Sequence, residues 1–363
     1  MKEKVKHLPS SPGVYLMKDY LGHIIYVGKS KNLKNRVQSY FQNSTNHSKK
    51  VEKLVTQIKD FDYILTDTEF EAFMLECQLI QKIKPFYNKL MKSPQSYTYI
   101  TFRMNKGIYR IECTYEKDLK NGCFSFGPYT SKKVVGKAIQ HLQECFKLQC
   151  SNQGNTNNPC LNYSLGLCIG ICFQSTAAKE YQRIMTSFIA LLKGTDEGLL
   201  KEMHNLMMEA AVLADFERAA KLRDGLEAIQ SLIQKEKVLT FTKDKKNIVV
   251  LEKINDCKVK LFLINQNKIL LKKGYVLEKN RLDFGEWMKL NIQTCFKQTA
   301  SNIAFEMKKE EIDEAQIVYR YLNRETSAYL VIPENWLEKD DSQLDNAIQQ
   351  YIRMTMEETI YLS

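Results

Sequence analysis

The sequence has no hydrophobic run that could cross a membrane. No apolar stretch in its 363 residues approaches the roughly 20 residues that a membrane-spanning helix needs. The N-terminal residues, MKEKVKHLPSSPG, are basic but are not followed by the apolar segment of a secretory signal. Internal repeats and long low-complexity linkers are also absent. These absences lead us to expect a cytoplasmic protein without membrane contacts.

Histidine is scarce, and the sequence lacks a nucleotide-binding loop. The chain has 5 histidines, and His7, His23 and His47 have no carboxylate or cysteine at metal-ligand spacing. The tripeptide Gly28-Lys29-Ser30 follows a β-branched run, as in a phosphate-binding loop, but that loop needs a glycine five positions before Gly28. His23 occupies this position and would block the tight backbone turn. We therefore expect another role for this basic segment.

Positive charge is plentiful, and much of it lies early in the chain. The formal net charge is +11. Residues 1–95 contain 16 Lys+Arg and 9 Asp+Glu, a surplus of 7, which is more than half of the total. A basic surplus of this kind favours a polyanionic partner such as nucleic acid.

The first 95 residues have the pattern of a compact α/β unit. The apolar runs at 13–17 and 24–27 predict a β-hairpin. A further strand is expected at 61–67. A strong helix is expected at 69–84, and Pro85 ends it.

The rest of the chain predicts further domains, so the fold class is multidomain α+β. We expect a middle region at 96–195, an antiparallel helical hairpin at 196–236 and a C-terminal α/β region at 237–363. The expected strands are 97–103, 108–114, 247–253, 258–264, 269–276 and 329–333; the expected helices include 134–146, 283–309 and 342–356; and FGPY at 126–129 is read as a turn.

Several polar residues of the first unit form a candidate site. Arg36 and Tyr40 are four positions apart and share one helix face. Glu76 lies in the apolar helical stretch FMLECQLI, where a carboxylate is either a surface residue or a metal ligand. Taken singly, each of these residues fits an ordinary structural role. Their order in the chain is more specific.

That order resembles the GIY-YIG nuclease domain of the UvrC family, the incision subunit of bacterial nucleotide excision repair. The segments that carry the resemblance are PGVY (12–15), IYVGKS (25–30) and TDTEFEAFMLECQLIQKIKPFYNKLM, together with Arg36. The first signature tripeptide is GVY in this chain instead of GIY, and the tyrosine is kept. The resemblance covers nearly all of residues 5–95.

The resemblance implies a single-metal phosphodiester hydrolysis. Glu76 would bind Mg²⁺ (or Mn²⁺), which commonly takes one or two protein carboxylates and stabilises charge on the leaving oxygen. Lys29 and Arg36 would neutralise phosphate oxygens.

The remaining residues would handle the attacking water. By resemblance, Tyr26 would take the proton from water; its unperturbed pKa near 10 requires nearby cations that favour the phenolate. Tyr15 and Tyr40 would position water or phosphate, and Asn88 would close the site.

Four of the ten cysteines form a spaced group. Cys150, Cys160, Cys168 and Cys172 have the spacing C-x₉-C-x₇-C-x₃-C, and disulfides are not expected in a reducing compartment. Four thiolates suit tetrahedral Zn²⁺ or a [4Fe–4S] cluster, and spacing alone does not choose. FGPY and P-C-L-x-Y-x-L-G-x-C-x-x-x-C resemble the UvrC segment whose cysteines hold a [4Fe–4S] cluster. Cys145 could compete with Cys150.

The helical stretch 199–233 resembles the UVR domain, through which UvrC proteins contact a similar hairpin of UvrB. The matching pattern is L-x-x-x-M…F-E-x-A-A-x-L-R-D. This implies a complex with UvrB, indirect contact with UvrA and damaged double-stranded DNA as substrate. On periodicity alone, the stretch is an ordinary helical pair.

UvrC proteins normally continue into an RNase H-like nuclease and helix-hairpin-helix modules, and no match to either is found in this sequence. We therefore expect one incision, by resemblance the cut on the 3′ side of the lesion, as in the shorter homologue Cho. The rival interpretations are a non-catalytic adaptor that binds DNA and UvrB, and an iron–sulfur regulatory protein.

Overall fold

The chain forms two compact units. Residues 1–93 and 241–363 make the first unit, and residues 94–240 make the second. The computed structural model describes residues 2–42, 48–88, 97–105, 108–118, 122–151, 158–244, 246–277, 282–299, 309–324, 328–337 and 342–357. No helix among these residues is both long and apolar enough to cross a membrane.

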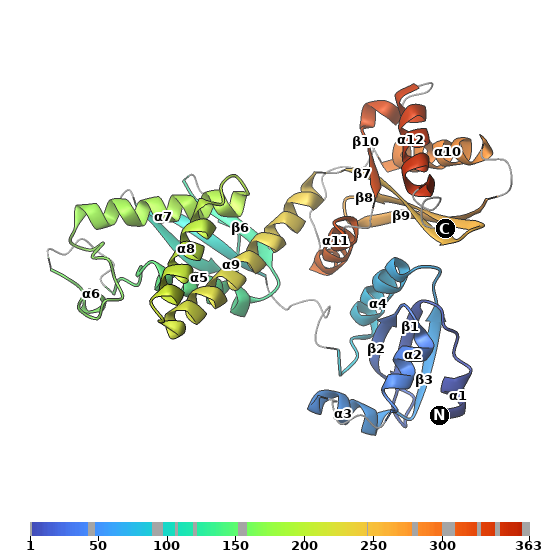
Figure 1. Ribbon diagram of the computed structural model, residues 1–363, viewed down its shortest axis with the longest axis horizontal. Coiled ribbons are helices and arrows are strands. Elements are labelled where there is room, and N and C mark those ends of the chain that lie inside the picture. Colours follow the sequence, from blue (N-terminus) through green and yellow to red (C-terminus); the bar gives the residue numbers. More distant parts are fainter. Residues whose placement is uncertain are drawn as a thin grey trace. The chain divides into compact units, whose positions relative to one another are not determined.

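A small antiparallel sheet with helices around it opens the first unit (Figure 1). The strand order is β2-β1-β3, so β1 lies in the centre. The elements are α1 (Lys2–Lys6), β1 (Gly13–Lys18), β2 (Ile24–Ser30), α2 (Leu33–Ser39), α3 (Lys49–Gln57), β3 (Asp60–Leu65) and α4 (Glu69–Ile83). Asp19 shapes the β1–β2 turn, because its side chain accepts the backbone N–H groups of Leu21 and His23. The predicted hairpin and α/β unit are confirmed.

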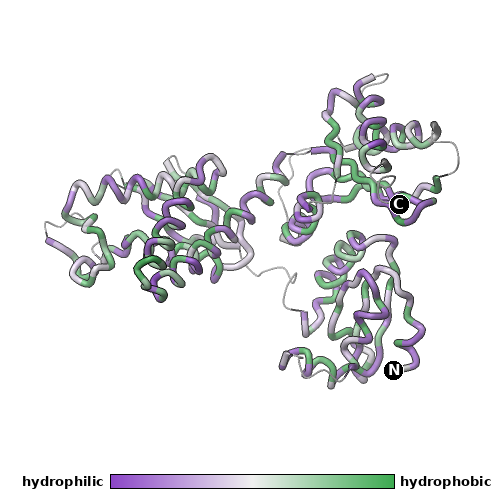
Figure 2. The backbone as a smooth tube through the Cα atoms, viewed as in Figure 1, coloured by the Kyte–Doolittle hydropathy of each residue, from purple (hydrophilic) through white to green (hydrophobic). Residues whose placement is uncertain are grey.

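A four-stranded antiparallel sheet forms the other part of the first unit. Its order is β10-β7-β8-β9. The elements are β7 (Asn247–Asn255), β8 (Lys258–Asn265), β9 (Lys268–Val276), α10 (Leu282–Thr299), α11 (Lys309–Leu322), β10 (Tyr329–Ile332), the 3₁₀ helix Glu334–Leu337 and α12 (Ser342–Glu357). The central strands β7 and β8 are strongly hydrophobic along most of their length (Figure 2). Such strands are buried on both faces.

The two faces of this sheet have different covers. Alternate residues such as Val249 and Leu261 face a core shared with α10 and α12. Their neighbours Ile248 and Phe262 face a core shared with α11 and with α4 of the N-terminal sheet. The two parts of the first unit, far apart in sequence, thus share α4.

Helix α4 has two apolar faces, which explains this arrangement. Ala72 and Ile80 pack against the small sheet, whereas Phe70 and Met74 pack on the C-terminal sheet. Thr68 caps the helix by accepting the N–H of Glu71 at 3.2 Å.

The second unit is a three-stranded sheet packed against long helices. The strand order is β5-β4-β6. The elements are β4 (Thr98–Asn105), β5 (Ile108–Thr114), β6 (Phe124–Tyr129), α5 (Lys132–Cys145), α6 (Leu161–Ser164), α7 (Ser175–Lys193), α8 (Gly198–Val212) and α9 (Phe216–Lys243). Helices α8 and α9 form the predicted hairpin, whose base joins the core of the unit through residues such as Met203 and Ile229.

Two sequence predictions differ from the structure. FGPY belongs to strand β6 instead of a turn; β6 lies at a sheet edge, where the missing N–H of Pro128 is tolerated. The helix expected at 283–309 is described only as α10, and residues 300–308 lie outside the described residues. Helix α11 was not predicted, because its charged start resembles an exposed segment until α4 supplies the partner for its apolar face.

Candidate functional site

The pairing of β1 with β2 explains the glycine of the Gly-Lys-Ser segment. Tyr15 and Gly28 are direct partners in the strand register. A Cβ atom on Gly28 would lie 2.3 Å from the Tyr15 hydroxyl oxygen, so only glycine lets the tyrosine ring lie across β2. This glycine therefore serves side-chain packing, in agreement with the sequence argument against a nucleotide loop.

Three tyrosines gather at this point. Their ring centroids lie 6.1 Å (Tyr15–Tyr26), 5.8 Å (Tyr15–Tyr40) and 6.4 Å (Tyr26–Tyr40) apart. The hydroxyl oxygens of Tyr15 and Tyr40 are hydrogen-bonded at 2.9 Å. Arg36 donates its Nε–H to the Tyr15 hydroxyl at 3.3 Å, and its guanidinium lies 5.2 Å from the Tyr40 ring centroid. The structure thus brings Tyr15, Tyr26, Arg36 and Tyr40 together.

The environment of Tyr26 does not favour a phenolate. Burial raises the pKa of Tyr26 well above its ordinary value, and Tyr40 and Glu76 raise this pKa further. Arg36 lowers it, but by less than burial raises it. Cations near Tyr26 would therefore have to outweigh the effect of burial on its pKa before Tyr26 could act as a phenolate.

Glu76 reaches the same place from helix α4. Its Oε1 accepts the backbone N–H of Lys29 at 3.0 Å, which joins the helix to the end of β2. Burial raises the pKa of the Glu76 carboxyl, while the Lys29 N–H and the charges of Lys29 and Arg36 oppose the rise. Among the described residues, Glu76 Oε2 has no hydrogen-bond partner. One carboxylate oxygen is therefore available to a cation.

Lys29 points its ammonium along α4. Its Nζ lies 2.9 Å from the centroid of the Phe73 ring and 3.8 Å from Glu69 Oε1. The other oxygen of Glu69 lies 3.6 Å from Nη1 of Arg324, from the C-terminal part. Burial lowers the pKa of Lys29, and the positive charge of Arg324 also lowers it.

Sequence reasoning missed Glu69, Phe73 and Arg324. Glu69 and Phe73 precede Glu76 by seven and three positions, so helical periodicity could have placed them on the same face of the helix as Glu76. Arg324 carries no comparable signal, because its position depends on packing over a separation of more than 240 residues.

Asn88 ties the chain after α4 to strand β2. Its Oδ1 accepts the N–H of Val27 at 2.9 Å, and its Nδ2 donates to the carbonyl of the same residue at 2.8 Å. Asn88 thus holds the backbone of Val27, which lies between Tyr26 and Lys29. Both hydrogen bonds are to this strand and not to the side chains of the candidate site.

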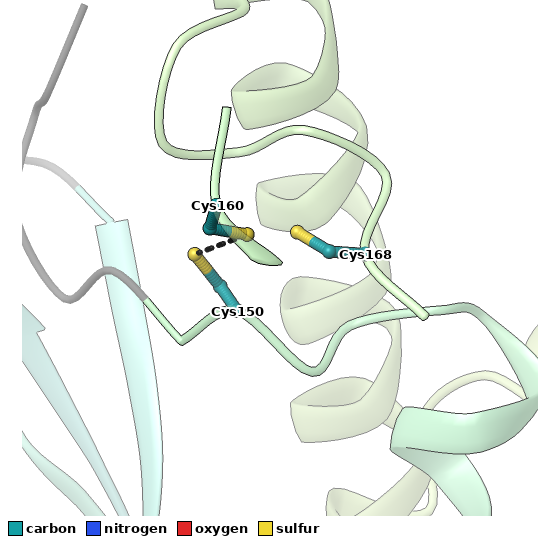
Figure 3. A group of neighbouring side chains, drawn as sticks. All are labelled: Cys150, Cys160 and Cys168. Carbon is teal, nitrogen blue, oxygen red and sulfur yellow. Dashed lines mark hydrogen bonds between the residues drawn. The ribbon is translucent and has the colours of Figure 1, made fainter. Parts of the chain in front are cut away.

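Three of the four spaced cysteines form a compact group in the second unit. The Sγ atoms of Cys150, Cys160 and Cys168 all lie within 4.8 Å of one another, with 3.9 Å between the first two (Figure 3). Cys172 belongs to the same buried cluster, but its Sγ contacts the carbonyl of Asn158 at 4.0 Å and is not part of the three-atom group. The competitor Cys145 packs against the main hydrophobic core of the unit instead.

Hydrogen bonding prepares one of these thiols for deprotonation. Burial raises the pKa of the Cys160 thiol, but hydrogen bonds from Ser151, Tyr163 and Cys168 oppose this and bring the pKa down to about 6. Burial raises the pKa of Cys168. A thiolate beside further thiols is a suitable start for a metal site.

Comparison with known proteins gives the family. Residues 11–89 match the UvrC-like GIY-YIG domain, residues 97–191 the middle domain of UvrC/Cho excinucleases and residues 197–232 the UvrB/uvrC motif. The chain belongs to the UvrC family. Curated UvrC relatives include UvrABC system protein C of Acetivibrio thermocellus, 35% identical over 342 residues, which are 92% of this chain and 55% of that protein. The same protein of Clostridium kluyveri is 34% identical over 365 residues, 98% of this chain and 58% of the relative.

The chain thus spans somewhat more than half the length of these UvrC relatives. Among solved structures, it is similar to the GIY-YIG N-terminal endonuclease domain of UvrC from Thermotoga maritima bound to its catalytic divalent cation, magnesium. The two are 38% identical, the similarity covers 24% of this chain and 93% of that one, and the TM-score is 0.22. A tyrosine-to-phenylalanine point mutant of the same UvrC domain matches with the same identity and TM-score and 92% coverage of that chain.

Proposed function

We propose that this chain is a GIY-YIG DNA endonuclease that nicks lesion-bearing duplex DNA in nucleotide excision repair, by resemblance on the 3′ side of the lesion. One observation carries the proposal: residues from β1, β2, α2 and α4 meet at one place although they are up to 61 positions apart. These residues are Tyr15, Tyr26, Lys29, Arg36, Tyr40 and Glu76. A set of unrelated surface residues would not be expected to converge in this way.

The donor set fits a hard divalent cation such as Mg²⁺ or Mn²⁺. Glu76 has one oxygen held by Lys29 N–H and one without a hydrogen bond among the described residues. Mg²⁺ keeps several waters and accepts a single carboxylate. When bound at Glu76, the ion would stabilise the charge that develops on the leaving oxygen.

The protein residues would orient and neutralise the DNA phosphate. Arg36 supplies a cation beside Tyr15 and Tyr40, and Lys29 supplies a second one near Glu76. Tyr26 would accept the proton of the attacking water. Tyr26 would do so as a phenolate: burial raises its pKa, and the positive charges of Arg36 and of an ion held at Glu76 would oppose that rise. The hydrogen-bonded hydroxyls of Tyr15 and Tyr40 would hold the Tyr26 ring and the water in place.

The α8–α9 hairpin supports recruitment by UvrB, and through UvrB an indirect contact with UvrA. Its tip exposes large apolar side chains, which are Met208, Val212, Leu213 and Phe216. Exposed apolar patches of this kind are typical of protein-binding surfaces. A non-catalytic adaptor would share the hairpin, but it would not need Glu76.

We propose that Cys150, Cys160, Cys168 and Cys172 hold a [4Fe–4S] cluster, as the family resemblance implies. Zn²⁺ is the second candidate, and a distance favours it. Thiolates around one tetrahedral zinc at about 2.3 Å lie about 3.8 Å apart, close to the 3.9 Å between Cys150 and Cys160 Sγ. A cluster binds each thiolate to a different iron and would spread them further. Iron and zinc analysis after anaerobic purification, with the visible absorption spectrum, decides between the two.

Four functional segments follow from the proposal, with the boundaries given by the sequence: a nuclease segment 1–95, a metal-binding segment 96–195, a UvrB-binding hairpin 196–236 and a C-terminal segment 237–363. A cytoplasmic location is part of the same proposal.

Nicking of a duplex with one bulky adduct tests the proposed activity. The full chain is used as wild type, as Glu76→Ala or as Glu52→Ala. Each version is incubated with the adducted duplex, its cognate UvrA and UvrB, ATP and Mg²⁺. Glu52 is an exposed carboxylate on α3 and controls for the charge change. We expect loss of nicking for Glu76→Ala alone. Equal nicking by wild type and Glu76→Ala would favour the adaptor.

A further inference from the structure

One cation of the C-terminal part lies beside the proposed nuclease site. Arg324 follows α11, and its backbone N–H donates to the carbonyl of Tyr321 at 3.3 Å. Its Nη1 lies 3.6 Å from Glu69 Oε2 on α4. The guanidinium carbon lies 5.8 Å from the centroid of the Phe73 ring, the same ring that Lys29 Nζ contacts. Arg324 and Lys29 thus flank the same helix face.

Packing between α4 and α11 fixes Arg324 in this position. The rings of Phe70 and Tyr321 are stacked, with centroids 3.9 Å apart and an interplanar angle of 11°. Both side chains belong to the core that α4 shares with the C-terminal sheet. The guanidinium of Arg324 lies 5.6 Å from the Tyr321 ring centroid, so it packs beside the stacked pair of Phe70 and Tyr321. The arginine is therefore placed by a buried contact, although its side chain is exposed.

Glu69 is shared between the two cations. One of its oxygens faces Lys29 Nζ at 3.8 Å, and the other faces Arg324 Nη1 at 3.6 Å. Two cations around one carboxylate leave a net positive charge. Both contacts are long and partly exposed, and ion pairs of this kind contribute little to stability. A DNA phosphodiester carries the same charge as the carboxylate on two oxygens, and a guanidinium binds such groups with paired N–H donors.

We propose that Arg324 is a phosphate-positioning residue that the C-terminal part contributes to the nuclease site, and that Glu69 holds Arg324 and Lys29 apart until a DNA phosphate takes its place. This inference rests on the proposed function. It gives the C-terminal part a role in binding the substrate of the N-terminal part.

The proposal predicts opposite effects for the two members of the ion pair. Arg324→Ala removes a phosphate contact and should weaken DNA binding about five- to tenfold at low salt. Glu69→Gln removes the competing carboxylate and should tighten binding about two- to fivefold. If the pair is merely structural, both substitutions break the same contact and shift binding in the same direction.

Fluorescence anisotropy with a labelled duplex, at several salt concentrations and without divalent cation, measures both effects in the full chain. Arg320→Ala is the matched control, because Arg320 is an exposed arginine on α11. The slope of log K against log salt should fall by about 0.9 for Arg324→Ala, the amount for one lost phosphate contact. Arg324→Lys keeps the charge but not the paired N–H donors, so it should restore the salt slope and only part of the binding. Equal weakening by Arg324→Ala and Arg320→Ala, or equal signs for Arg324→Ala and Glu69→Gln, would overturn the proposal.

The nicking assay separates this inference from the proposed function. If Glu76→Ala abolishes nicking while Arg324→Ala nicks and binds as wild type, the inference is wrong and the nuclease assignment stands. If Glu76→Ala nicks as wild type, the nuclease assignment fails, and the inference fails with it.

Discussion

Replacing Phe70 by alanine should destabilise a sheet that lies far away in the sequence. Phe70 is on α4 and is only 1% exposed. Its ring stacks on Tyr321 and meets the edge of Phe262, with centroids 5.3 Å apart. Both partners belong to the C-terminal part of the first unit. Removal of the ring leaves a cavity in the core that the two parts share.

The expected loss follows from the depth of this contact. Truncation of a fully buried phenylalanine costs about 3–5 kcal/mol in free energy of unfolding. With a urea m-value of about 2–3 kcal/mol/M, the midpoint of unfolding should fall by about 1–2.5 M. A surface position would shift the midpoint by much less.

Tryptophan fluorescence reports on this unit selectively. The chain has two tryptophans, Trp287 and Trp336, and both pack against the C-terminal core. A change on α4 should therefore move a transition that is observed only in the C-terminal part. Leu142→Ala, in the core of the second unit, is the control and should leave this transition in place.

The result that refutes this reasoning is simple. If Phe70→Ala leaves the tryptophan transition within roughly 0.2 M of wild type, the two parts do not unfold as one unit. The placement of Arg324 beside the proposed nuclease site would then lose its support.

Four further outcomes are expected. Gly28→Ala should reduce nicking strongly, because the new Cβ displaces the Tyr15 ring; wild-type nicking would contradict this. Asn88→Ala loses two hydrogen bonds to β2 and should cost about 1–3 kcal/mol in urea unfolding. The Lys260 ammonium lowers the pKa of Asp67. The ion pair between them therefore stabilises the fold above about pH 4, and this stabilisation is lost as the pH falls through the lowered pKa of Asp67. Lys260→Met should flatten that part of the plot of unfolding free energy against pH, and an unchanged plot would count against the ion pair. Cys160→Ser should lower the bound metal per chain, measured by elemental analysis.

Local signals in the sequence predicted much of the first sheet and its site. The β1–β2 hairpin has a turn residue between two apolar runs, and α4 has a strong period and a proline stop. Both elements are determined by residues close together in the chain, so they can be predicted from a single sequence. The candidate site, including Glu76, came from the resemblance of the residue order to the UvrC family, because each residue taken singly fits an ordinary structural role.

Contacts over long separations could not be predicted in the same way. The sequence of α4 shows that the helix is apolar, but not that Phe70 and Ala72 face different sheets. Helix α11 was missed for the same reason, since its buried face is recognised only when α4 is known to cover it. The roles proposed for Glu69 and Arg324 depend on the same contact between α4 and α11.

The insertion of the second unit has a consequence for synthesis on the ribosome. Helix α4 ends at Ile83 and its partner α11 ends at Leu322, a separation of 239 residues. At about 5–20 residues per second, the nascent chain would carry the apolar side of α4 for roughly 10–50 s before α11 emerges. During that interval, Phe70 and Met74 lack the C-terminal side chains that bury them in the folded unit. The face of α4 that carries Phe70 and Met74 thus meets α11 only after the whole second unit has been synthesised.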